Sequence, residues 1–121
     1  MIGQIWCAPG SSTYAIITWQ TPLAAAAVNN LLTWAHNTIT NYINTVGDGL
    51  VPHGAYQLAG EGLELYLENT GNHQQTWGVV NAAIVALAGF QMTGSVGPMA
   101  VVIQVYDGMH FVGRGFLRAA G

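Results

Sequence analysis

Four histidines are the side chains best suited to hold a metal ion or to transfer a proton near neutral pH. They are His36, His53, His73 and His110. No two of them form a His-x-His pair or lie four residues apart, and no pair of cysteines accompanies them. Zinc sites normally include at least one such close pair of ligands. We therefore expect these histidines to bind no metal.

The acidic residues are the candidate general bases, and Cys7 or a serine is the candidate nucleophile. The acids are Asp48, Glu61, Glu64, Glu68 and Asp107. Glu64 and Glu68 share one face of a predicted strand, about 13 Å apart, which is too far for a carboxylate pair. No Gly-x-Ser-x-Gly motif, phosphate-binding loop or dinucleotide fingerprint is present. We therefore expect that the protein is not an enzyme and has no catalytic residue and no cofactor. The alternative is a hydrolase whose active site is built from scattered residues, and it would show a cleft in which several titratable groups have shifted pKa values.

Charge is scarce in this chain. Only 6% of its 121 residues are charged, against about 25% in an ordinary soluble domain. Arg114 and Arg118 are the only cations besides histidine, and the net charge is −3. Nucleic-acid binding by electrostatics needs a basic patch, so we expect no nucleic-acid partner. Asn, Gln, Ser and Thr outnumber the charged residues, and such a neutral surface provides little repulsion between copies.

The spacing of hydrophobic residues predicts two helices and four or five strands. The expected elements are a strand at 14–19, a helix from Thr21-Pro22 to Gly47, a loop or short hairpin at 50–62, a strand from Leu63, a helix from an Asn72 cap to Gly94, and a hairpin in which 101–106 and 110–117 flank a type I′ turn at Asp107-Gly108. Gly113 and Gly115 indicate a bulge or a close backbone approach in the last strand.

These elements predict an α+β fold in a single domain, residues 1–121, with residues 1–13 as an N-terminal arm. Two helices pack on one face of a four- to five-stranded, mainly antiparallel sheet, in an arrangement similar to the ferredoxin-like plait. In this arrangement one face of the sheet has no helix to cover it.

Two stretches of the sequence resemble a known family. They are Asn-His-Gln-Gln-Thr-Trp-Gly-Val-Val-Asn-Ala-Ala at 72–83 and Val-Tyr-Asp-Gly-Met-His-Phe-Val-Gly-Arg-Gly-Phe at 105–116. Together they resemble a family of small fungal secreted proteins of unassigned activity, over the C-terminal half of the chain. The resemblance implies an extracellular α+β domain with no assigned catalytic site. The cysteine framework of disulfide-rich fungal toxins is lacking, which argues against a toxin.

Cys7 is the single cysteine, so an intrachain disulfide framework is excluded. It is either a buried or idle thiol or one half of an intermolecular disulfide in an oxidising compartment. Residues 1–20 lack a basic start followed by an apolar core, so this numbering shows no signal peptide. Two explanations are compatible with this: the chain is cytoplasmic, or the sequence is that of a mature or recombinant form. We expect the second, a protein that is secreted and extracellular. No apolar run reaches about 18 residues, so we expect no membrane span.

We expect the protein to associate with copies of itself, as a homo-oligomer or a filament subunit. The uncovered sheet face would expose a larger apolar patch than monomers usually tolerate, and edge strands with few charges favour strand addition. The residues expected to mediate this contact are Trp6, Cys7, Val102, Tyr106, Val112 and Phe116. Trp6 has the alternative of packing back onto its own domain.

The alternative function is a small secreted binding module. Its open sheet face or its loop at 50–62 would meet a carbohydrate or a host protein. Tyr56, Tyr66 and Tyr106, together with neutral amides, would suit stacking against a sugar.

Overall fold

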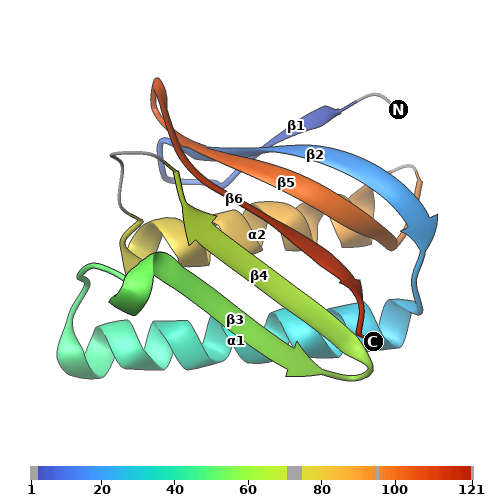
Figure 1. The fold of residues 1–121 in the computed structure, drawn as a ribbon, viewed down its shortest axis with the longest axis horizontal. Helices are drawn as coiled ribbons and strands as arrows, with labels where there is room; N and C mark the ends of the chain where they lie inside the picture. The colour runs from blue at the N-terminus through green and yellow to red at the C-terminus, as the bar shows by residue number, and fades with distance from the viewer. Residues whose placement is uncertain (1–2, 71–74, 95, 121) are drawn as a thin grey trace.

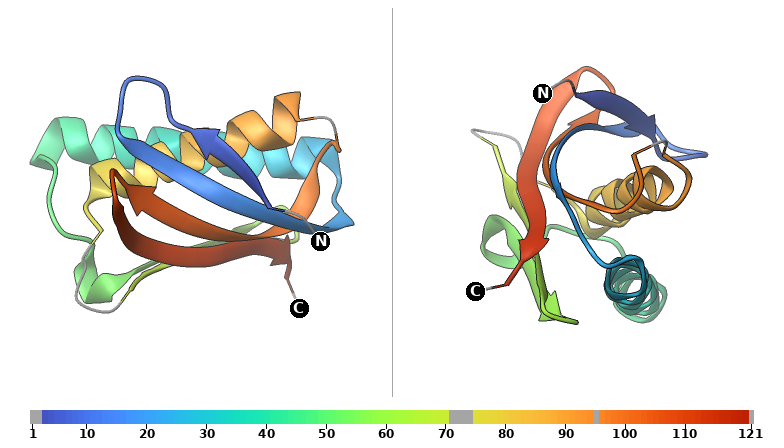
Figure 2. Two further views of the ribbon diagram at one scale, coloured as in Figure 1. Left: turned by 90° about the horizontal axis from the view of Figure 1, so that it is seen from above. Right: turned by 90° about the vertical axis from the view of Figure 1, so that its right-hand side faces the viewer.

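The computed structural model describes residues 3–70, 75–94 and 96–120 (Figure 1). In chain order its elements are β1 (Gln4–Cys7), β2 (Thr13–Pro22), α1 (Ala25–Val46), the short 3-10 turn η1 (Pro52–Gly54), β3 (Ala55–Gly60), β4 (Leu63–Asn69), α2 (Trp77–Thr93), β5 (Met99–Asp107) and β6 (His110–Ala119). The strands form one sheet in the order β1-β2-β5-β6-β4-β3. Both helices lie on the same side of this sheet, whose strands curve around them (Figure 2).

The α+β class, the two helices and the antiparallel sheet are confirmed, but the predicted number of strands is wrong. The sheet has six strands because β1, inside the predicted arm, pairs with β2, and β3, inside the predicted loop, pairs with β4. Every pairing in the described sheet is antiparallel. The sheet therefore lacks the parallel strands that a split βαβ unit of the ferredoxin-like plait contains.

The core lies between the sheet and the two helices. The three leucines of β4 alternate with polar residues, and they are buried against the helices at 4% exposure or less. Phe90 of α2 is fully buried, and its ring centroid lies 6.0 Å from those of Trp6 and Trp19. These contacts join β1, β2 and α2, so the N-terminal strand belongs to the packed structure.

The helix ends follow the sequence signals only in part. Gly47 ends α1, as predicted, and has a φ of +106°, a value that favours glycine. The helix begins at Ala25, however, because Thr21 and Pro22 prolong β2, where Pro22 pairs with Met99. The cap of α2 is Thr76, whose Oγ1 accepts a hydrogen bond from the Val79 amide. The predicted cap, Asn72, lies outside the described residues.

Loops of two residues connect β5 to β6 and β3 to β4. The predicted hairpin between β5 and β6 is present, but its loop is Gly108-Met109, and only Gly108 has a positive φ. One positive φ at the first loop residue is the pattern of a type II′ turn. The type I′ pattern occurs instead between β3 and β4, where Glu61 and Gly62 both have positive φ.

One extra residue interrupts the pairing of β6 with β5. Val105 pairs with Gly113 while Tyr106 pairs with Phe111, so Val112 has no partner of its own. Such a bulge breaks the alternation, so the residues before Gly113 face the side opposite to the one that simple alternation from Arg114 predicts. Val112 is consequently buried in the core at 7% exposure, and its predicted place on the uncovered face is wrong. The predicted bulge is confirmed.

Thr70 holds this bulge in place from the end of β4. Its amide donates a hydrogen bond to the Val112 carbonyl at 3.2 Å, and its hydroxyl donates to the Phe111 carbonyl at 2.5 Å. Thr70 is buried, and its two hydrogen bonds give each of these carbonyl groups a donor within the protein.

Gly115 marks a close approach between β6 and β4. A Cβ at this position would overlap the carbonyl oxygen of Tyr66, which belongs to the backbone of β4 and cannot move aside alone. The predicted close approach in the last strand is therefore confirmed.

We expect Gly115→Ala to destabilise the protein by about 1–3 kcal/mol, the usual effect of overpacking. The matched control is Gly49→Ala, because Gly49 has an ordinary φ and an added methyl group would meet no described atom within 4 Å. Urea unfolding of both variants measures the difference. Equal stability of the two variants would show that the approach at Gly115 is not a constraint.

Candidate functional site

The face of the sheet opposite the helices carries the candidate site, and we call it the open face. The site consists of outward residues from five of the six strands. These are Ile5 and Cys7 of β1, Tyr14, Ile16 and Thr18 of β2, Val102, Gln104 and Tyr106 of β5, Phe111, Arg114, Phe116 and Arg118 of β6, and Glu64, Tyr66 and Glu68 of β4.

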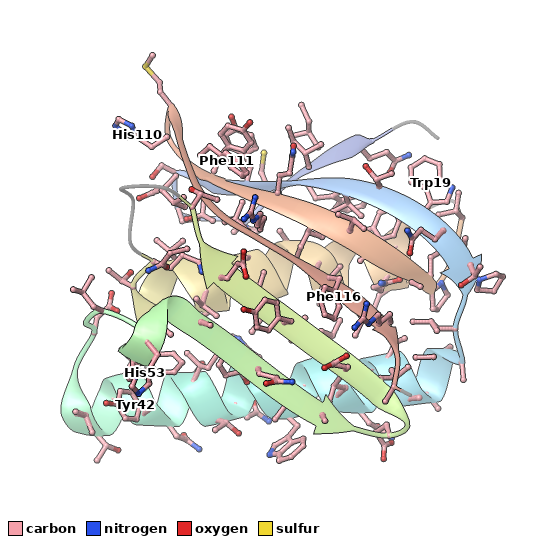
Figure 3. The ribbon with its side chains drawn as sticks, in the orientation of Figure 1. Trp19, Tyr42, His53, His110, Phe111 and Phe116 are labelled. Atoms are coloured by element: carbon pink, nitrogen blue, oxygen red, sulfur yellow. The ribbon has the colours of Figure 1, made fainter. Side chains whose placement is uncertain are left out.

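Three aromatic rings stack in a row across one end of the open face. The rings of Tyr14 and Tyr106 lie 5.1 Å apart and almost parallel, at 4°. Phe111 stacks on Tyr106 at 5.2 Å and 26°. Figure 3 shows Phe111 near the β5–β6 turn. Adjacent strands bring these rings together, so the row depends on the register of β2, β5 and β6.

A second aromatic group lies further along the same face. The Tyr66 and Phe116 rings stack at 5.5 Å, and the Arg118 guanidinium lies 4.0 Å from the Phe116 centroid. Val102, on the strand beside Phe116, is 44% exposed. A shallow hollow of about 210 Å³ lies over Val102, Phe116 and Tyr66. An aromatic surface with an arginine on it has the composition of a protein interface.

Two ion pairs join β4 to β6 across the open face. Arg114 Nε lies 2.9 Å from Glu68 Oε2, and Arg118 Nε lies 3.3 Å from Glu64 Oε1. All four side chains remain accessible to water, and exposed pairs of this kind contribute little to stability. Their main effect is to fix the positions of both arginines and to cancel charge on this face.

Tyr66 completes a hydrogen-bonded group around Glu68. The Tyr66 hydroxyl donates to Glu68 Oε1 at 2.8 Å, while Arg114 occupies Oε2. The hydrogen bonds from Arg114 and then from Tyr66 hold the pKa of the Glu68 carboxyl below its usual value. The same hydrogen bond to Glu68, with partial burial, raises the pKa of Tyr66. Glu68 is thus a fixed carboxylate that accepts hydrogen bonds.

A pocket of about 650 Å³ lies where the segment before β3 meets β4. Its lining consists of Leu50, Val51, His53, Gly54, Ala55, Tyr66, Glu68 and Asn69. His53 and Gly54 form its rim in two consecutive left-handed conformations, with φ of +59° and +69°. A Cβ at Gly54 would lie 2.9 Å from Asn69 Nδ2, so the rim approaches the amide of Asn69 closely.

The backbone of Gln75 braces the pocket from behind. Its amide donates to Asn69 Oδ1 at 2.8 Å, and its carbonyl accepts from the Val51 amide at 3.1 Å. Asn69 and Val51 both line the pocket, so one buried residue fixes two of its walls.

The structure brings together some of the predicted contact residues and separates others. Val102, Tyr106 and Phe116 share the open face, and the exposed Cys7 pairs with Tyr14 on β2. Trp6 points the other way, with its ring against Phe90 and Gly89 of α2. It has therefore packed back onto its own domain.

Tyr14 and Phe111 were missed by the sequence prediction, which named the loop at 50–62 as a possible binding segment but not the pocket that it forms with β4. The signal for Phe111 was present, because the glycine that indicates a bulge also implies that the residues before it change face. Nothing in the sequence indicated that the segment before β3 would lie beside Glu68, because β4 and this segment meet only through the tertiary pairing.

Metal-binding groups and membrane spans are not found in the described ranges. No three His, Cys, Asp or Glu side chains gather there into a group that could hold a metal ion. His36 instead bonds through Nδ1 to Asn81 Oδ1 at 2.9 Å, and His73 lies outside the described residues. Neither described helix combines the length and hydropathy needed to cross a membrane.

No family model, curated protein or solved structure matches the chain. The role of the site therefore follows from its own geometry.

We expect Glu68→Gln to lower the melting temperature at neutral pH, and the difference from wild type to shrink at acidic pH. The folded-state pKa of Glu68 lies below the unfolded value near 4.5. The stabilisation is therefore complete above the unfolded pKa and is lost as the pH falls through the lowered folded pKa. Thermal unfolding of both proteins across a pH series measures this. A difference that is the same at neutral and acidic pH would contradict the role of the carboxylate.

Proposed function

We propose that the protein is a non-enzymatic, self-associating subunit that forms a homo-oligomer or a filament through its open face. The observation that carries this proposal is the uncovered sheet: the described helices cover one face only, and the other presents two aromatic groups, with the exposed Val102 beside Phe116 of the second. Aromatic and arginine side chains supply most of the binding energy in interfaces.

The charges of the open face suit a contact between identical copies. Each copy carries two arginines on β6 and two glutamates on β4, in neighbouring rows. In a two-fold pairing the same patch meets itself, so an arginine row can face the glutamate row of the second copy. The ion pairs would then be shared between copies, and the aromatic groups would lose their contact with water.

The sheet edges offer a second route by which copies can add. Both edge strands, β1 and β3, are free of charged residues. Natural sheets commonly protect such edges with lysine or other charges. Edge pairing would extend a dimer into a filament, whereas packing of the open faces alone gives a closed dimer.

The chemistry of the pocket supports a non-enzymatic role. The pocket does gather His53, Tyr66 and Glu68, as a hydrolase would require. Glu68, however, has both oxygens bound and a lowered pKa, which makes it a weak base. The residues that line the pocket include no serine, threonine, cysteine or lysine, which are the usual nucleophiles of enzymes.

We also propose that the protein acts outside the cell. The resemblance of residues 72–83 and 105–116 to small fungal secreted proteins supports this, as does a surface that relies on neutral polar groups. An extracellular setting would further permit the exposed Cys7 to form a disulfide between copies.

We expect Val102→Lys to weaken self-association at least tenfold. A lysine at the centre of the open face would place like charges together across a two-fold contact, which costs several kcal/mol. Sedimentation velocity over a concentration series, with a reducing agent present, measures the effect. The wild type should rise above the monomer mass of 12.8 kDa as concentration increases.

The matched control is Val46→Lys, which makes the same change at an exposed valine on the last turn of α1. It should associate as the wild type does. A wild type that stays monomeric at every concentration, or two variants with equal dissociation constants, would refute the proposal.

The second candidate is a small binding module, and the 650 Å³ pocket is the observation that favours it. Pockets of about 300–1,000 Å³ are the usual size of small-molecule sites. A monomer that binds a ligand without assembling would support this candidate over the first.

A further inference from the structure

The pocket beside η1 is a feature that self-association does not require. The aromatic row and Val102 belong to β2, β5 and β6, whereas the pocket belongs to β4 and to the segment from Leu50 to Ala55. The open face and the pocket meet at Tyr66 and Glu68 of β4, which contribute to both. A ligand in the pocket would therefore give the protein a property separate from the contact between copies.

The charge of the pocket limits the ligands that it can take. Glu68 is a carboxylate, so an anionic ligand would be repelled. Arg114 already pairs with Glu68 at 2.9 Å, so a cationic ligand would gain little from the same carboxylate. The charge distribution thus favours an uncharged ligand with hydrogen-bonding groups.

The hydrogen-bonding groups of the pocket match hydroxyl groups. Each Glu68 oxygen has one protein donor, Tyr66 or Arg114, and a carboxylate oxygen can accept a further hydrogen bond. Asn69 and His53 can each donate, and an imidazole or amide can also accept. Leu50, which is exposed, and the partly buried Ala55 provide apolar surface beside these groups. Adjacent hydroxyls on an apolar ring are the arrangement that this combination fits.

We propose that this pocket is a binding site for a neutral saccharide of one or two sugar units. Glu68 accepts hydrogen bonds from sugar hydroxyls, Asn69 and His53 complete the polar contacts, and the C–H face of the ring packs on the exposed Leu50.

The backbone at His53 supports a binding role. A non-glycine residue with φ of +59° is strained, and such strain is concentrated at functional sites. Glycine would adopt this conformation without strain. If the imidazole of His53 serves ligand binding and not the fold, replacing His53 by glycine should leave the stability of the protein unchanged and weaken ligand binding.

The test is a nuclear magnetic resonance titration of the ¹⁵N-labelled full chain. The probes are D-glucose, D-galactose, D-mannose, N-acetyl-D-glucosamine, cellobiose and lactose, with D-glucuronate as the charged counterpart. At least one neutral probe should shift the amide signals of His53, Gly54, Tyr66, Glu68 and Asn69 in a saturable way. Glucuronate should bind at least tenfold more weakly than the corresponding neutral sugar.

Two variants and one matched control separate binding from folding. Glu68→Gln should weaken binding about tenfold or more, because an ionised carboxylate accepts stronger hydrogen bonds than a neutral amide. His53→Gly should weaken binding while its melting temperature stays equal to or above that of the wild type. Glu64→Gln should leave binding unchanged, since Glu64 pairs with Arg118 as Glu68 does with Arg114 but does not line the pocket.

The titration is repeated in Val102→Lys, so that failure to bind sugar and failure to self-associate are separate results. The saccharide site is refuted if no neutral probe shifts the pocket signals, if glucuronate binds as well as glucose, or if Glu68→Gln and His53→Gly bind as the wild type does.

Discussion

The two hydrogen bonds from Thr70 to the carbonyls of Phe111 and Val112 determine which side chains reach the open face. They hold an extra residue in β6 and so reverse the alternation of this strand at one point. Val112 enters the core, Phe111 joins the stack with Tyr106, and the regular alternation after the bulge keeps Arg114 and Phe116 outward. Without the bulge, either the core or the aromatic row would lose a side chain.

Gly113, which follows the extra residue Val112, lies close to Gln75. A Cβ there would overlap the side-chain amide of Gln75, which is fully buried beneath the sheet. Gln75 in turn fixes Asn69 and Val51 through its backbone. The bulge, the buried glutamine and the pocket walls are therefore one connected unit, and a change in the register of β6 would reach the pocket.

The few charges of the chain are used at defined places. Four of them form the two ion pairs of the open face. The remaining acids each accept a hydrogen bond: Asp48 from the Gly78 amide, Glu61 from Asn30 and Asp107 from Ser12. Neither helix carries a charged residue, so the stability of the helix layer depends on packing against the sheet. The few charged residues thus lie on the open face and at the connections between elements.

The open face and the pocket share only Tyr66 and Glu68, which gives the two proposals a physical link. A second copy packed on the open face would lie next to the pocket, because Glu68 contributes to both. Arg114 holds Glu68 in the same position for either role.

Local patterns in the sequence determined both helices, four of the six strands completely or in large part, and the direction of many side chains, but not β1, β3 or the start of α1. The alternation in β4 predicted its buried leucines, Gly47 predicted the end of α1, and Gly113 and Gly115 predicted the irregularity of the last strand. These features depend on periodicity, on a backbone conformation that favours glycine, as at Gly47, or on the absence of a Cβ, as at Gly113 and Gly115, so neighbouring residues are enough to indicate them.

Contacts between distant segments were decided only by the tertiary structure. The pairing of β1 with β2, the docking of Trp6 on α2 and the partnership of Arg114 with Glu68 each join residues that no local pattern relates. The face of Val112 belongs to this group as well, because Thr70 fixes the position of the extra residue from 42 positions away in the chain. The sequence alone established the scarcity of charge and the excess of apolar sheet residues, whereas strand order and register determined which of them share a surface.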